Sequence, residues 1–281
     1  MGDIIEAIDG ITTREMNLVQ VNGFLANPAD KPAALTIIRL GRGEPESISV
    51  NRAVTKAPPI ESKLIEGDIA YLRIPILSLG KAEEARKDLD GLLKKGASRI
   101  ILDLRSSAGG EEQEGIALAN LFLDSGVIAY VQGQKVEKKI FGADAKAALT
   151  KAPLVVLVNK GTSGPPELVA GAINDNSRGQ IVGARTFGTG ALQRLIPLEN
   201  GSALLISVAK YYTPAGKEIQ NTGIRPNVEV ASEADDILDL SSDQELEVQP
   251  PKQATPQGNE DRQLNKAIEI LKAPKVTNRA A

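Results

Sequence analysis

Residues 101–110 of the 281-residue chain, ILDLRSSAGG, place a short apolar run directly before a glycine-containing loop. The apolar part predicts a buried strand over Arg99–Leu104, and the glycines predict a loop that exposes backbone N–H groups. On either side, amphipathic stretches predict helices over Ala82–Lys95 and Glu112–Leu123. This alternation of strands and helices favours an α/β (α+β) fold with a largely buried sheet.

The alternation extends through residues 60–230, which are expected to form one α/β core. A proline-led amphipathic stretch predicts a helix over Pro165–Asn174. Apolar or alternating runs predict the remaining strands. These strands are Ile69–Ile76, Val127–Gln132, Pro153–Asn159, Gln180–Ala184, Ala191–Pro197 and Ala203–Tyr212.

Both ends of the chain differ from this core. Residues 1–55 are expected to form a small β-rich domain, and residues 231–281 a flexible acidic and Pro/Gln-rich linker with a short C-terminal helix. Because the chain begins as if inside a domain, the natural N-terminus is expected to lie further upstream. The predicted elements are strands over 2–10, 34–40 and 47–54, helices over 18–26 and 261–272, and a turn over 41–44.

Composition narrows the possible chemistry. The net charge is −3 and no long basic run occurs, so nucleic acid is not an expected partner. The chain has no Cys and no His, which excludes thiolate and imidazole catalysis and the common metal motifs. We therefore expect no metal and no cofactor, and any hydrolytic base must be Lys, Asp or Glu. No apolar run is long enough to predict a membrane span.

Three glycine-containing loops follow predicted strands, at the place where open α/β sheets usually bind ligands. They comprise residues 106–110, 160–164 and 185–190. Their backbone N–H groups could form an oxyanion hole or hold a peptide carboxylate. Alternatively, the glycines serve only turns and helix caps. The loops by themselves leave both interpretations open.

The order of the motifs resembles that of the carboxyl-terminal processing (tail-specific) serine proteases of peptidase family S41. Residues 101–110 resemble the family segment LDLRxNxGG, and residues 186–193, TFGTGALQ, resemble TFGKGxxQ. Residues 153–159 with 167–172 resemble the nucleophile strand and helix, and residues 211–227 resemble YYTPxGxxIQxxGIxPD. Residues 1–55 resemble the later two-thirds of a PDZ domain, which implies an N-terminally incomplete PDZ domain.

The resemblance implies a Ser–Lys dyad, but this chain departs from it at both positions. The nucleophile position is Gly164 and the general-base position is Thr189, separated by 189 − 164 = 25 residues as the pair requires. Gln193 matches the supporting glutamine, and Ser163 stands one residue before the nucleophile position. The implied oxyanion donors are the backbone N–H groups of Gly109 and Gly110, with the position of Pro165 in doubt.

These departures lead to three functional hypotheses. The first is a non-catalytic homologue that binds unstructured polypeptides or protein C-termini, or acts as a scaffold. The second is an active serine-type peptidase that uses Ser163 as a displaced nucleophile. The third is a structural protein whose C-terminal helix makes a homo-oligomer contact. The resemblance also implies an exported location, in the periplasm, the cell envelope or a plastid lumen.

Overall fold

The computed structural model describes residues 4–14, 16, 21, 24–25, 32–39, 44–51, 57–198, 203–231 and 261–273. The chain divides into two compact units. The first comprises Met1–Lys56 with Ile196–Leu204, and the second comprises Ala57–Leu195 with Leu205–Ala281. Strands and helices occur together, so the mixed α/β class predicted from the sequence is confirmed. The division into domains at residues 55, 60 and 230 stays a prediction.

The first unit contains a four-stranded antiparallel sheet in the order β2-β1-β3-β4. Asp9 and Gly10 have φ values of 49° and 81°, which suit a tight turn between the first two strands. The helix predicted over 18–26 and the turn predicted over 41–44 lie mostly outside the described residues. The partial PDZ assignment remains a prediction. The strands are β1 Ile4–Ile8, β2 Ile11–Thr12, β3 Ala33–Ile38 and β4 Glu46–Val50.

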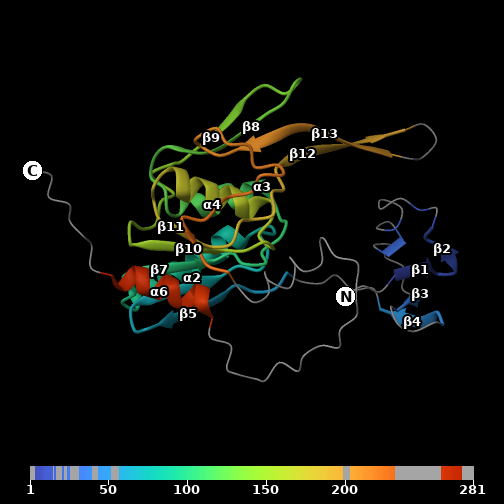
Figure 1. Ribbon diagram of the computed structural model, residues 1–281, viewed down its shortest axis with the longest axis horizontal. Helices are drawn as coiled ribbons and strands as arrows, with labels where there is room; N and C mark the ends of the chain where they lie inside the picture. The colour runs from blue at the N-terminus through green and yellow to red at the C-terminus, as the bar shows by residue number, and fades with distance from the viewer. Residues whose placement is uncertain are drawn as a thin grey trace, which may run out of the picture. The chain divides into compact units, whose positions relative to one another are not determined.

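A six-stranded sheet forms the centre of the second unit, in the order β14-β11-β10-β7-β6-β5 (Figure 1). Neighbouring strands are parallel except for β5, which is antiparallel to β6. Parallel strands bring their carboxyl ends to one edge, so the loops that follow them share that edge. The strands are β5 Glu61–Ile65, β6 Ile69–Arg73, β7 Arg99–Asp103, β10 Leu154–Val158, β11 Gln180–Gly183 and β14 Val228–Glu229.

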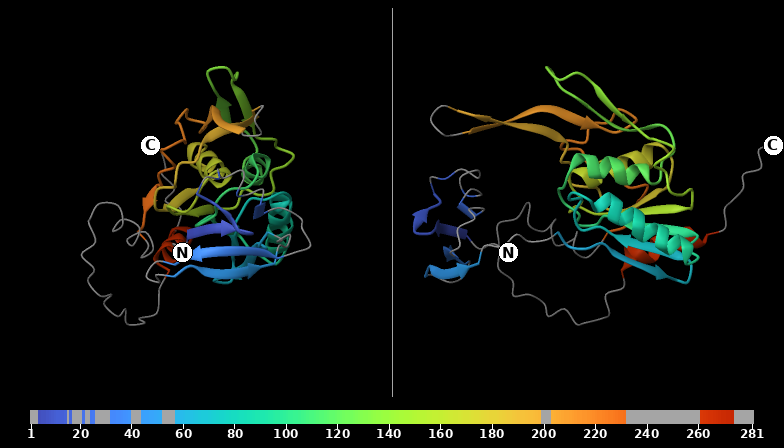
Figure 2. Two further views of the ribbon diagram at one scale, coloured as in Figure 1. Left: turned by 90° about the vertical axis from the view of Figure 1, so that its right-hand side faces the viewer. Right: turned by 180° about the vertical axis from the view of Figure 1, so that it is seen from behind.

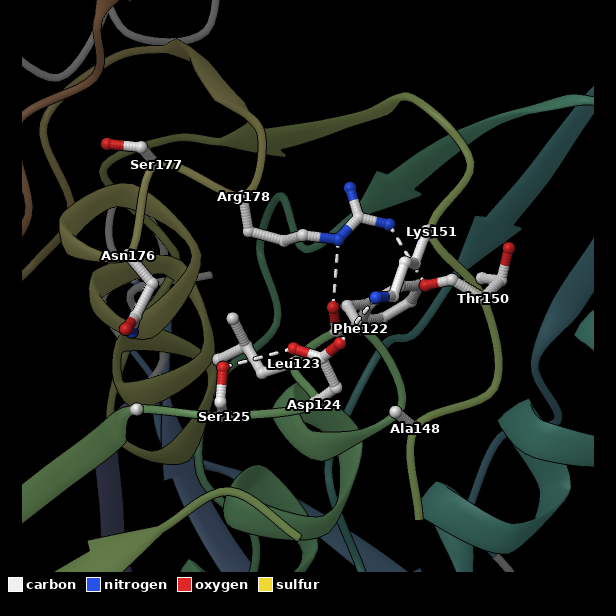
Figure 3. Close-up of a pocket in the computed structure, with 11 residues that line it drawn as sticks. Phe122, Leu123, Asp124, Ser125, Ala148, Thr150, Lys151, Asn176, Ser177 and Arg178 are labelled. Atoms are coloured by element: carbon white, nitrogen blue, oxygen red, sulfur yellow. Dashed lines mark hydrogen bonds and ion pairs between the residues drawn. The ribbon is translucent and has the colours of Figure 1, made fainter. Parts of the chain in front are cut away.

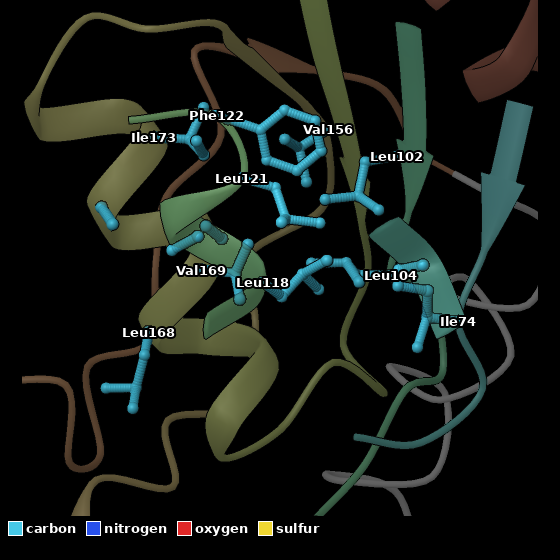
Figure 4. Close-up of a cluster of buried hydrophobic side chains, with 14 of the residues drawn as sticks. Ile74, Leu102, Leu104, Leu118, Leu121, Phe122, Val156, Leu168, Val169 and Ile173 are labelled. Carbon is cyan, nitrogen blue, oxygen red and sulfur yellow. The ribbon is translucent and has the colours of Figure 1, made fainter. Parts of the chain in front are cut away.

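Helices cover both faces of this sheet, as a parallel sheet requires. Helices α2 (Lys81–Lys94), α3 (Glu112–Asn120) and α4 (Pro165–Asp175) contribute to one core, and α6 (Arg262–Lys272) contributes to the other. The left view of Figure 2 shows α2 and α6 on opposite sides of the strands. Figure 4 shows Leu118, Val169 and Ile173 packed toward sheet residues of the first core.

A further four-stranded sheet has the order β12-β13-β8-β9. Its strands are β8 Val127–Gln132, β9 Lys139–Gly142, β12 Ala191–Pro197 and β13 Ala203–Tyr212. Strands β8 and β13 are antiparallel, with Tyr130 opposite Tyr212 and their rings stacked at 4.9 Å. Strand β12 is the terminal strand on one side of this sheet.

Four strands were not predicted from the sequence: β2, β5, β9 and β14. Each lies at the edge of its sheet, where strands are often short and charged because one side faces solvent. The predicted C-terminal helix is confirmed as α6. The predicted linker up to about residue 258 and the chain end from residue 274 lie outside the described residues. None of the described helices is both long and apolar enough to cross a membrane.

Candidate functional site

The three loops singled out in the sequence lie together at the carboxyl edge of the central sheet. Two backbone hydrogen bonds join the first loop to the second. Ser163 N–H donates to Ser107 O at 2.9 Å, and Gly109 N–H donates to Ser163 O at 3.1 Å. The third loop joins the second through Phe187 N–H, which donates to Thr162 O at 3.0 Å. The loops therefore form one connected surface.

Gly164 lies between β10 and α4 in a backbone conformation that glycine adopts without strain. It is the N-cap of α4, with φ 76° and ψ −129°, a region that residues with a side chain rarely adopt. In hydrolases, a nucleophile on a sharp strand-to-helix turn is held in a strained conformation. A Cβ built on Gly164 would lie 3.8 Å from Gly109 Cα, an ordinary van der Waals distance. The turn therefore has space for a side chain that the residue lacks.

Ser163 and Thr189 contact each other directly. Their hydroxyl oxygens lie 2.8 Å apart and share a hydrogen bond. A threonine hydroxyl has no base function near neutral pH, so this bond cannot activate the serine as a general base would. The structure thus brings together the general-base position and the residue before the nucleophile position, but the contact is between two neutral hydroxyls.

Glu167 connects the nucleophile turn to the third loop. Its carboxylate is fully buried and accepts four hydrogen bonds. Burial raises the pKa of this carboxyl above its ordinary value, and the four hydrogen bonds reduce that rise because they stabilise the charged form. In the sequence, Glu167 is noted only as the first residue of the segment 167–172 that resembles the nucleophile helix. Its place three residues after the helix cap was the available signal, because a glutamate there can accept a hydrogen bond from the N–H of the capping residue. The donors are Gly164 N–H at 2.9 Å, Gly188 N–H at 2.7 Å, Thr189 N–H at 2.7 Å and the Thr186 hydroxyl.

Gln193 lies apart from this cluster. It is on β12 with an exposed side chain, and its Nε2 donates to Ser207 Oγ on β13 at 3.5 Å. Among the described residues, none of its hydrogen bonds reaches Ser163 or Thr189. The supporting role that the resemblance implied for Gln193 stays a prediction.

The implied oxyanion donors are in three different situations. Gly109 N–H is already bonded to Ser163 O. The backbone of Gly110 lies so close to Leu77 that a Cβ on residue 110 would be 2.2 Å from the Leu77 carbonyl oxygen. Close packing therefore explains why this residue is glycine. Pro165 has no N–H and begins α4, where proline suits the first turn. The residue after the nucleophile position therefore cannot donate to an oxyanion.

Arg105 links the first loop to the C-terminal helix. Its guanidinium donates to Asp103, which is fully buried, at 2.9 and 3.0 Å and to Asp261 at 2.7 and 2.8 Å. Burial acts against the ionised form of Asp261, but the hydrogen bond and charge of Arg105, together with the backbone N–H groups of Leu264 and Gln263, outweigh it and lower the pKa of Asp261. Asp261 also caps α6 by accepting from Leu264 N–H at 3.0 Å. The sequence analysis did not connect these distant residues.

A cavity of about 410 Å³ lies at the other end of α4 from the candidate site. Figure 3 shows Arg178 directed toward loop carbonyls there. It donates to Phe122 O at 2.8 Å, Thr150 O at 3.1 Å and Ala152 O at 2.8 Å. Arg178 thus holds two loop segments, one at Phe122 and one over Thr150–Ala152, which is a structural role. Within the described part of the chain, no group of three or more acidic side chains is arranged to hold a metal ion.

The fold and the site define an α/β protein whose candidate site lies at the carboxyl edge of a parallel sheet. Residues 68–230 match the model of peptidase family S41, and the chain belongs to that family. The resemblance stated from the sequence motifs is therefore confirmed.

Individual relatives agree with this assignment. The chain is 33% identical to a carboxyl-terminal-processing protease of Synechocystis over 251 residues, which covers 88% of this chain and 58% of that protein. It is 36% identical to a carboxy-terminal-processing protease of Bartonella bacilliformis, covering 82% of this chain and 54% of that protein. A solved structure of the photosystem II D1 C-terminal processing protease is 29% identical, with a TM-score of 0.64, covering 83% of this chain and 64% of that one. The chain thus spans less than two-thirds of the length of these relatives.

Proposed function

We propose that this chain is a non-catalytic member of peptidase family S41 that binds unstructured polypeptides or protein C-termini, or serves as a scaffold. The observation that carries the proposal is the pair Gly164 and Thr189. Gly164 stands on the strand-to-helix turn where the resemblance implies the nucleophile, and it has no side chain. Thr189 offers a hydroxyl where the resemblance implies a lysine.

Ser163 does not supply the missing chemistry. Its hydroxyl is paired with the Thr189 hydroxyl, which does not accept a proton near neutral pH. Its backbone is held by Ser107 and Gly109, so a shift toward the Gly164 position would break two hydrogen bonds. Pro165 and Pro166 further restrict the turn, because each proline fixes φ. These contacts argue against a displaced nucleophile.

The expected partner follows from the names of the relatives. They are called carboxyl-terminal-processing proteases, and we extend their recognition of chain ends, without cleavage, to this chain. An exported location, periplasmic or in the cell envelope, and homo-oligomer formation are part of the same proposal. The plant relatives are named as chloroplastic, which agrees with a location outside the cytosol.

Restoring both altered positions tests the assignment. The matched set is Gly164→Ser, Thr189→Lys and the double variant, each incubated with a fluorogenic unstructured peptide. We expect slow cleavage by the double variant and none by either single variant, because nucleophile and base act as a unit. The rate should stay low, since Pro165 offers no N–H to the oxyanion. Cleavage by Thr189→Lys alone, lost when Ser163→Ala is added, would instead identify Ser163 as the nucleophile.

A further inference from the structure

Among the described residues, no strand pairs with the outer edge of β12, which begins next to the candidate site. In the part of the chain that the structure describes, β12 is the terminal strand of its sheet, with β13 as its neighbour. Its first residue, Ala191, follows Thr189 after a single glycine. An unpaired edge presents backbone N–H and C=O groups to any chain that lies along it. This edge therefore leads from the site outward.

Exposed apolar side chains lie on β12 and on the neighbouring strand β13. Leu195 on β12 is 52% exposed and Leu205 on β13 is 55% exposed. Gln193 contacts Ser207, and residues two apart on a strand share a face, so Leu195 and Leu205 lie on the face that carries this contact. Neighbouring residues of a strand point to opposite faces, which places the partly exposed Ile206 on the other one.

The loop end of the edge is apolar as well. Phe187, two residues before Thr189, is 69% exposed although its backbone is fixed by the hydrogen bond to Thr162. A large aromatic side chain held in solvent beside a ligand site is a ready contact for an apolar ligand. Apolar surface therefore occurs at both ends of the stretch from Phe187 to Leu195.

We propose that an extended, apolar peptide adds as a strand to the outer edge of β12 over Ala191–Leu195 and leads one of its ends to the Thr189 loop. This inference rests on the proposed peptide-binding function and names where and how the peptide binds. Main-chain hydrogen bonds to β12 supply affinity, and the apolar residues on both faces select apolar side chains. Leu195 is six positions after Thr189, so at about 3.3 Å per residue the peptide contact is about 20 Å long.

The experiment measures fluorescence anisotropy of a fluorescein-labelled ten-residue peptide of Val, Ala and Thr with a free carboxyl terminus. A twin peptide is N-methylated at four consecutive central residues, which removes N–H donors from both of its edges. The protein variants are Leu195→Asp and Leu205→Asp. Leu79→Asp is the matched control, because Leu79 is 87% exposed and lies before α2, outside this strand. All three sites are exposed, so circular dichroism should show unchanged folding.

We expect Kd to rise about tenfold or more for the N-methylated twin and for Leu195→Asp, with a smaller rise for Leu205→Asp and none for Leu79→Asp. Binding that is unaffected by N-methylation or by Leu195→Asp would overturn the β12 site and leave the proposed peptide binding intact. No binding of the unmodified peptide by the wild-type protein would count against both.

Discussion

Replacing Glu167 by glutamine probes the connection between the nucleophile turn and the third loop. Glutamine has nearly the same shape, but one of the two carboxylate oxygens becomes an NH2 group. All four partners of Glu167 donate to it, and three of them are backbone N–H groups that cannot accept a bond. Whichever way the amide is turned, its NH2 group faces at least one backbone N–H.

The loss of stability in Glu167→Gln is set by the amide orientation that leaves fewer backbone N–H groups without an acceptor. If the amide oxygen faces Gly164 and Thr189, only Gly188 N–H loses its acceptor, at a cost of about 1–3 kcal/mol for a buried donor. The remaining bonds weaken because they are no longer charge-assisted. Removing the buried charge offsets part of this loss. The net decrease in the free energy of unfolding is about 2 kcal/mol, or about 4–8 °C in Tm.

Thermal unfolding followed by circular dichroism measures this difference. Glu111→Gln is the control, because Glu111 is exposed and should change stability by less than about 0.5 kcal/mol. Hydrogen exchange of Gly188 and Thr189 N–H should also become faster in Glu167→Gln. A variant with wild-type Tm and unchanged exchange would refute the idea that Glu167 holds the two loops together.

Two further predictions concern buried and charged groups. The buried Ser107 hydroxyl has no hydrogen-bond partner among the residues that the structure describes, whereas the buried Thr162 hydroxyl donates to Leu104 O at 2.8 Å. Ser107→Ala should therefore leave stability unchanged or raise it by about 1 kcal/mol, while Thr162→Val should lower it by about 1–3 kcal/mol in urea denaturation; equal losses would contradict this. Asp261→Asn keeps the helix cap but loses the ion pair with Arg105, about 0.5–1 kcal/mol for a partly exposed pair. Because the pKa of Asp261 is lowered, this loss should be full above the ordinary pKa of an aspartate, about 4, and shrink as the pH falls below it; a loss that does not shrink on acidification would contradict it.

Strong local sequence patterns explain which strands and helices could be predicted correctly. The run Leu154–Val158 is wholly apolar and β-branched-rich, and it forms a fully buried strand. Pro165 and Pro166 mark the start of α4 as proline at a first helical turn does. The charged, exposed edge strand β5 has no comparable pattern, so local reasoning could not find it.

The contacts of the site depend on residues far apart in the chain. The pairing of Arg105 with Asp261 spans 156 residues, and no local pattern encodes it. The hydroxyl contact between Ser163 and Thr189 required the positions of two loops in space. For Gln193, the motif supplied a role, but the structure places its side chain against Ser207. Motifs thus located the site, while its interactions emerged only from the fold.

The central claim is that the turn at Gly164 no longer supports peptide hydrolysis. Its most direct test is mass spectrometry of an unstructured peptide with an apolar C-terminus after incubation with the wild-type protein. We predict an intact peptide, together with saturable binding of the same peptide. Turnover by the wild-type protein that disappears in Ser163→Ala would contradict the claim and establish an active serine peptidase with a displaced nucleophile.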